Sequence, residues 1–100
     1  QAIHGAVFRT LRFLLRERLR LGQSHTILDA TNLLRKHRRP FLKIAAQYGA
    51  ETEAVFFDVP LALALARNAA RNRVVPPEVI REMAAQLQPP QQSEGFVQIK

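Results

Sequence analysis

The sequence contains no cysteine, which excludes a disulfide framework and a thiolate metal site and is typical of a cytoplasmic protein. Its longest apolar run, Val59 to Ala66, holds eight residues, well short of the roughly 20 that a helix needs to cross a bilayer. It has no glycine-rich loop with a lysine that could hold the phosphates of a nucleotide. Its three histidines are isolated and lack the spacing of a metal site. We therefore expect neither a metal site nor a membrane partner.

The positive charge is concentrated in one half of the 100-residue chain. Residues 1–50 carry ten Lys and Arg against two acids, whereas residues 51–100 carry five against six. A basic half is compatible with a polyanionic partner such as nucleic acid, although such charges are also common on solvated helix faces. The sequence opens at Gln1 on a helical pattern without a cap. Because one domain typically spans about 100 to 200 residues, we expect this chain to be a piece of one.

The hydrophobic pattern predicts an α/β chain in which helices alternate with strands. Apolar residues recur at helical spacing in four segments, while the segment Ala54 to Phe57 is apolar throughout, as in a strand buried on both faces of a parallel sheet. The predicted helices cover residues 4–21, 34–48, 60 to about 71, and 77–87, and the predicted strands cover 26–29, 53–58 and 96–99. This order implies right-handed crossovers between parallel strands.

Polar residues follow the first predicted strand, where ligands bind in open parallel sheets. These are Asp29, Thr31 and Asn32, and a carboxylate there could hold a metal-bound water or an incoming hydroxyl. Alternatively, Asp29 or Asn32 caps the next helix, since both side chains accept hydrogen bonds from free amides. Asp58 directly precedes a helix start, and we interpret it as a cap.

Arg67 and Arg71 lie four residues apart where an alanine-rich helix breaks, so both would project from one face of it, and Arg73 follows in the break. Arginine suits phosphate because its planar fork donates two parallel hydrogen bonds and keeps its charge. Alternatively, these arginines stabilise the negative end of the helix dipole. Their spacing alone leaves both interpretations open.

Taken together, four motifs resemble one family in order and spacing. They are Leu28-Asp29-Ala30-Thr31-Asn32-Leu33, Phe57-Asp58-Val59-Pro60, Arg67-Asn68-Ala69-Ala70-Arg71 with Val75-Pro76, and Glu94-Gly95-Phe96. The chain resembles the C-terminal part of a P-loop kinase of the polynucleotide 5'-kinase type, within the AAA-like kinases. The likeness covers residues 4–99.

The resemblance implies that residues 1–100 form part of a P-loop NTPase-type parallel sheet flanked by helices, with a helical lid at about 67–77. It implies ATP as donor, Mg²⁺ as cofactor and a 5'-hydroxyl nucleic-acid end as acceptor. On this basis Arg67 and Arg71 contact the ATP phosphates, Arg73 lies in the lid, and Val74 and Val75 lie near the adenine. Asp29, Thr31 and Asn32 match the segment that faces the active site.

The same resemblance places the phosphate-binding loop and the general base upstream of the first helix. A missing N-terminal segment or another chain would then complete the sheet, and this chain alone would not be competent. Two other interpretations stay open. One is a small-molecule or toxin-like kinase on the same scaffold, and the other is a non-catalytic module that binds nucleic acid through its basic first helix and residues 35–39.

Overall fold

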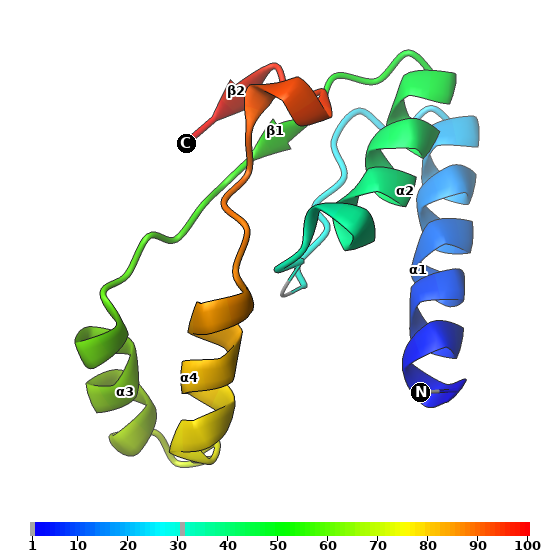
Figure 1. Ribbon diagram of the computed structural model, residues 1–100. Helices are drawn as coiled ribbons and strands as arrows, with labels where there is room; N and C mark the ends of the chain where they lie inside the picture. The colour runs from blue at the N-terminus through cyan, green and yellow to red at the C-terminus, as the bar shows by residue number, and fades with distance from the viewer. Residues whose placement is uncertain (1, 31) are drawn as a thin grey trace.

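The chain folds into three parts, a pair of helices, a small parallel sheet and a helical hairpin (Figure 1). This computed structural model describes residues 2–30 and 32–100. The elements are α1 (Ala2–Arg20), α2 (Arg35–Gln47), β1 (Glu53–Ala54), α3 (Leu61–Ala69), α4 (Pro77–Gln86), the 3₁₀ turn η1 (Gln92–Glu94) and β2 (Gln98–Ile99). Among the described residues, no helix is long and apolar enough to cross a membrane.

Helices α1 and α2 pack on each other and form the main core. Phe41, Ile44 and Ala45 are the buried apolar residues of α2, and Ile44 is only 2% exposed. Phe8 of α1 lies against Phe41, with ring centroids 6.3 Å apart. The shared interface accounts for the apolar face of α2 but for only part of that of α1, since Val7 and Leu14 are exposed. The predicted bounds of α2 differ from the observed ones by one residue at each end.

The two strands pair in parallel, as predicted, with Glu53 opposite Gln98 and Ala54 opposite Ile99. Backbone hydrogen bonds continue beyond the paired residues, from Val97 N to Thr52 O (2.8 Å) and from Phe56 N to Lys100 O (2.8 Å). This ladder brings the last residues of the chain beside its middle. The described chain is thus a helix-rich α/β arrangement with a small parallel sheet.

The predicted strands are longer than the observed ones, and one is wrong. Residues 26–29 form no strand, and Ile27 is 91% exposed. Within β1, pairing ends early, and Phe57 is 81% exposed instead of buried on both sides. A strand requires a neighbour to accept and donate its backbone hydrogen bonds, and the described residues supply none beside these segments.

Helices α3 and α4 form a hairpin that stands apart from the rest of the chain in Figure 1. It is joined to the remainder by two extended segments, which we call the first arm (residues 55–60) and the second arm (residues 87–91). Pro77 occupies the first turn of α4 with Glu78 beside it, as predicted. Helix α3 ends at Ala69, two residues before the predicted end at Arg71.

Candidate functional site: the tip of the α3–α4 hairpin

Asn68 holds the turn between α3 and α4 in a fixed shape. Its side-chain amide donates to the carbonyl of Val75 (2.7 Å) and its oxygen accepts from the backbone amide of the same residue (3.0 Å). The residue is 4% exposed, the most buried position in the hairpin. Since both polar groups of the side chain are satisfied by the backbone of one residue seven positions on, Asn68 closes residues 69–74 into a compact loop.

The three arginines of the predicted site lie on and beside this loop. Arg67 is in the last turn of α3, while Arg71 and Arg73 follow the end of the helix. The backbone amide of Arg71 donates to the carbonyl of Asn68 (3.2 Å), so a tight turn replaces the predicted continuation of the helix. The expectation of one shared helix face is therefore wrong, because Arg71 lies outside the helix.

All three arginines are exposed, and none makes a hydrogen bond or ion pair with the described residues. Val74 is exposed beside them, and Val75 is half-buried with its backbone held by Asn68. The tip thus presents three unpaired guanidinium groups, one on the last turn of α3 and two on the loop that Asn68 closes. Such a surface can receive a phosphate, because arginine donates paired hydrogen bonds to its oxygens.

The second predicted group lies elsewhere. Asp29 is exposed, Thr31 lies outside the described residues, and Asn32 has a left-handed backbone with φ 45°. The Asn32 side-chain oxygen is buried without a hydrogen-bond partner in the described chain. Figure 1 places this segment near the start of α2, away from the hairpin tip. The structure therefore does not bring the two predicted groups together.

The capping interpretations are wrong in the described structure. Helix α2 has Leu34 as its N-cap residue and α3 has Pro60, and neither residue caps its helix through a side-chain hydrogen bond. Asp58 is exposed and makes no hydrogen bond with the described residues. The partner of the free amide at the start of α2 is a residue far along the sequence, because Arg35 N donates to the side-chain oxygen of Gln88 (2.9 Å).

A buried ion pair joins α2 to η1, and the sequence did not predict it. The guanidinium of Arg38 donates to both carboxylate oxygens of Glu94, at 2.9 Å each, and also to the carbonyl of Asn32 (2.8 Å). The Arg38 and Glu94 side chains are 9% and 4% exposed. The hydrogen bond from Arg38 holds the pKa of Glu94 below its ordinary value, although burial acts in the opposite direction.

This pair corrects the interpretation of residues 35–39 as one basic surface, because Arg38 is buried and neutralised. The available signal was a charged residue three positions before Phe41, on the apolar face of the helix. Its partner, however, is 56 residues away in sequence. Asn68 carried a clearer signal. Asparagine is a poor helix former, and in the last turn of an alanine-rich helix it indicates a bond from the side chain to the backbone.

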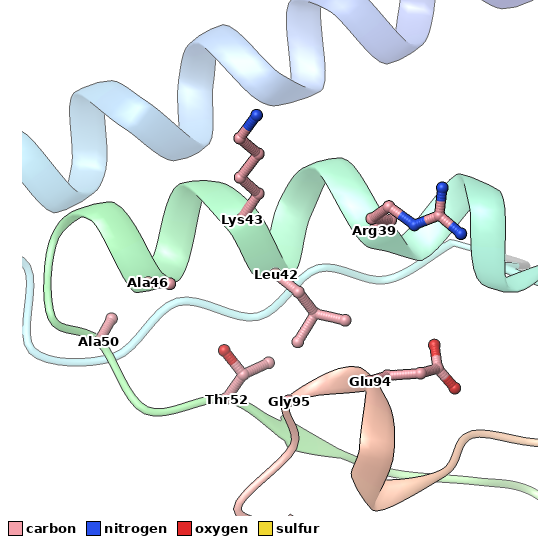
Figure 2. Close-up of a pocket in the computed structure, with 8 residues that line it drawn as sticks. All are labelled: Arg39, Leu42, Lys43, Ala46, Ala50, Thr52, Glu94 and Gly95. Carbon is pink, nitrogen blue, oxygen red and sulfur yellow. The ribbon is translucent and has the colours of Figure 1, made fainter.

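A cavity of about 350 Å³ lies between α2 and the segment that contains η1 (Figure 2). The side chain of Leu42 points into it toward Thr52 and Gly95, whereas Lys43 points away toward α1. Arg39 and Glu94 lie at one end. None of the hairpin arginines lines this cavity, so it is separate from the tip.

The helix-rich α/β order with its small parallel sheet fits a fragment of a P-loop-type α/β fold. The chain belongs to the AAA domain family, whose model matches residues 2–90. This family is of the P-loop NTPase type and includes kinases, so the predicted resemblance is confirmed at that level. No curated protein matches the chain.

The family generally binds ATP and Mg²⁺. The exposed, unpaired arginines fit the phosphates of ATP. The described residues contain no group of three or more His, Cys, Asp or Glu side chains that could hold a metal ion. The part of the chain that the structure describes thus presents exposed cations but no such ligand group, and no step below depends on the metal.

Proposed function

We propose that this chain is part of an ATP-dependent phosphotransferase and that the α3–α4 hairpin is its lid. The observation that carries the proposal is the set of three exposed arginines at the hairpin tip, free of any ion pair with the described residues. One is in the last turn of α3, and two are on the loop closed by the Asn68–Val75 hydrogen bonds. Cations that are left unpaired on an ordered loop suit an anion that arrives from outside. The membership of the chain in the AAA domain family supports ATP as that anion.

In this function Arg67 and Arg71 bind the phosphates of ATP and stabilise the phosphoryl group during transfer. Phosphoryl transfer depends mainly on positioning and on charge stabilisation at the transferring group. Arg73 adds charge from the same loop, and Val74 and Val75 cover the adenine. The phosphate-binding loop and the general base belong to residues upstream of Gln1, so this chain supplies the closing half of the site.

For the phosphoryl acceptor we propose a 5'-hydroxyl nucleic-acid end. Lys36, Arg39 and Lys43 are exposed on α2 and make no ion pair with the described residues, and such cations attract a phosphate backbone. A small-molecule or toxin-like kinase would not need them. A panel of 5'-hydroxyl oligonucleotides, nucleosides and sugars, offered to the complete protein, separates the two, and phosphorylation of sugars alone would contradict the nucleic-acid acceptor.

The lid is tested by Arg67→Ala and Arg71→Ala in the protein that contains this chain with its phosphate-binding loop. We expect each variant to lower kcat by about a hundredfold or more, the range for the loss of one charge-stabilising donor. Arg81→Ala on the exposed face of α4 is the matched control and should leave kcat unchanged. Weaker binding of oligonucleotides with unchanged affinity for ATP would rule out the lid.

The upstream sequence provides a second test. We expect the reading frame to encode GxxxxGK(S/T) about 50 to 80 residues before Gln1, which leaves space for one strand and one helix before the next βα unit. An upstream sequence without this loop would contradict the proposed function.

A further inference from the structure

The two arms of the hairpin are attached to the rest of the chain in different ways. In the first arm, Phe56 N donates to Lys100 O (2.8 Å). Beyond it the described residues show only a local bond from Val59 N to Phe57 O (3.0 Å) and a bond from Ala64 N of α3 to Pro60 O (3.0 Å). Among the described residues, 57–59 thus make no backbone hydrogen bond outside the arm. The second arm is tied to the first residue of α2, because the side-chain oxygen of Gln88 accepts from Arg35 N. A hairpin held in this way can turn about the second arm.

Gln88 makes the attachment with both its backbone and its side chain. Its backbone N–H donates to the carbonyl of Leu33 (2.8 Å), and its side-chain oxygen accepts from the backbone N–H of Arg35 (2.9 Å). The second bond satisfies a free amide at the first residue of α2, which an acceptor stabilises. Pro89 and Pro90 follow directly and fix the backbone on the far side of the attachment.

The buried Arg38–Glu94 ion pair also connects the second arm to the Asn32–Arg35 segment. Gln91 N donates to Glu94 (2.9 Å), and Glu94 is held by Arg38, which also donates to the carbonyl of Asn32. The segment Asn32–Arg35 and the second arm are therefore joined at Gln88 and again through Arg38 and Glu94. The end of the lid and the segment predicted to face the active site form one hydrogen-bonded unit.

We propose that Gln88 is a positioning residue that fixes the pivot of the α3–α4 hairpin to the Asn32–Arg35 segment. The proposal rests on the lid function of the hairpin. With the pivot fixed, Arg67 and Arg71 close along one path toward the face that carries Asp29 and Asn32. When the side-chain bond is lost, the hairpin keeps its own fold through Asn68 but approaches this face in many orientations.

Three variants separate the pivot from general stability. Gln88→Ala removes the acceptor for Arg35 N, whereas Gln88→Glu keeps an oxygen in that place and adds a negative charge that the start of a helix favours. Gln86→Ala, at the exposed end of α4, is the matched control. The chain has no cysteine of its own, so spin labels can be attached at Gln47→Cys on α2 and Ala85→Cys on α4.

Pulsed electron spin resonance on the full chain then measures the spread of distances between α2 and the hairpin. We expect the distribution to widen in Gln88→Ala and to return to the original width in Gln88→Glu, with Gln86→Ala unchanged. Equal widths in Gln88→Ala and the original chain would overturn the pivot, and so would a Gln88→Glu distribution as wide as that of Gln88→Ala.

Kinetics of the complete kinase test the link between pivot and lid. We expect Gln88→Ala to lower kcat about tenfold with KM for ATP unchanged, because the bond acts on the closed geometry, and Gln88→Glu to restore kcat. If the complete protein shows no ATP-dependent turnover, the lid function is contradicted, whatever the distance measurements show about the pivot. Full kcat in Gln88→Ala of an active kinase would overturn the positioning role itself.

Discussion

Asn68 has the largest structural role of any single residue in the hairpin. Its amide satisfies both the N–H and the C=O of Val75, and alanine would leave these backbone groups without a partner. An unsatisfied buried polar group costs about 1–3 kcal/mol. The position of the arginine loop thus depends on a residue that does not itself contact phosphate.

We therefore expect Asn68→Ala to loosen the hairpin and its loop. Amide hydrogen exchange in residues 61–86 should become faster, because the closing bonds are lost, while exchange in α2 should not change. Asn72→Ala is the matched control, since Asn72 is exposed in the same loop and makes no hydrogen bond with the described residues. Equal exchange in the two variants would show that the Asn68 bonds do not hold the loop.

The Arg38–Glu94 pair gives the stability of the chain a predictable pH dependence. The hydrogen bond from Arg38 lowers the pKa of Glu94 in the folded chain, so the unfolded chain takes up the proton at higher pH than the folded one. The stabilisation is complete above the ordinary glutamate pKa of about 4.3. It is lost as the pH falls through the lower pKa of the folded state.

Urea unfolding at pH 7 and in the acid range below pH 5 measures this pH dependence of stability. We expect Glu94→Gln to destabilise the chain at pH 7, because Arg38 keeps a buried charge without a partner, and to flatten the acid-induced loss of stability. Glu53→Gln is the control, since its ion pair with Lys100 is exposed and such pairs contribute little. If Glu94→Gln loses stability with falling pH as the original chain does, the acid-induced loss does not come from Glu94.

At the scale of elements, the hairpin and the α1–α2 pair differ in how they are stabilised. Helix α2 buries Phe41, Ile44 and Ala45, whereas the described residues of α3 and α4 include no buried apolar side chain. The main contacts of α3 are with α4. Regions with little buried apolar contact open with a small free energy, which suits a lid.

We expect amides in α3 and α4 to exchange with solvent faster than those in α2 by at least tenfold, which corresponds to about 1.4 kcal/mol of local opening free energy. Hydrogen exchange followed by mass spectrometry measures this directly. In the complete kinase, an ATP analogue should slow exchange in residues 61–77 and leave the α1–α2 interface unchanged. Protection of the hairpin as strong as that of α2 without nucleotide would contradict a mobile lid.

The sequence predicted the helices well and the strands poorly, for a physical reason. A helix satisfies its own backbone hydrogen bonds, so apolar periodicity and residues such as Pro77 and Glu78 are enough to place one. Residues 26–29 have the composition of a strand, but a strand depends on a neighbour. The Arg38–Glu94 and Gln88–Arg35 bonds join residues more than 50 positions apart, and no local pattern records such a pairing.

The candidate site shows the same division. The phosphate-binding role of the arginines near the end of α3 stays a prediction from their local chemistry, and the structure shows them exposed and without an ion pair among the described residues. Their distance from the Asp29–Asn32 segment was not predictable, because it depends on how the two arms place the hairpin. The structure also shows that Arg71 lies in a tight turn after α3, a feature that the Asn68 side chain determines.

At the scale of the whole molecule, the basic half of the chain is less uniformly available than its composition suggests. Arg38 is buried with Glu94, Arg20 pairs with Glu17, and Arg18 donates to Thr26 and to the carbonyl of His25. Within residues 1–50, the exposed cations that make no hydrogen bond or ion pair with the described residues lie on α1 and α2. They are Arg9, Arg16, Lys36, Arg39 and Lys43. Within this half of the chain, the surface that can meet a polyanion is thus the α1–α2 pair.

If this surface holds the nucleic-acid acceptor, oligonucleotide affinity falls steeply with salt, because each neutralised phosphate releases counterions. Removing Lys36 and Arg39 together should weaken binding and reduce the slope of log K against log salt concentration by about 1.4, the value for two contacts to a single strand. Arg18→Ala is the control, since its guanidinium is engaged within the chain. Fluorescence anisotropy with a labelled 5'-hydroxyl oligonucleotide, over a range of salt concentrations, measures both quantities. An unchanged slope in the double variant would place the acceptor on another surface and favour a small-molecule substrate.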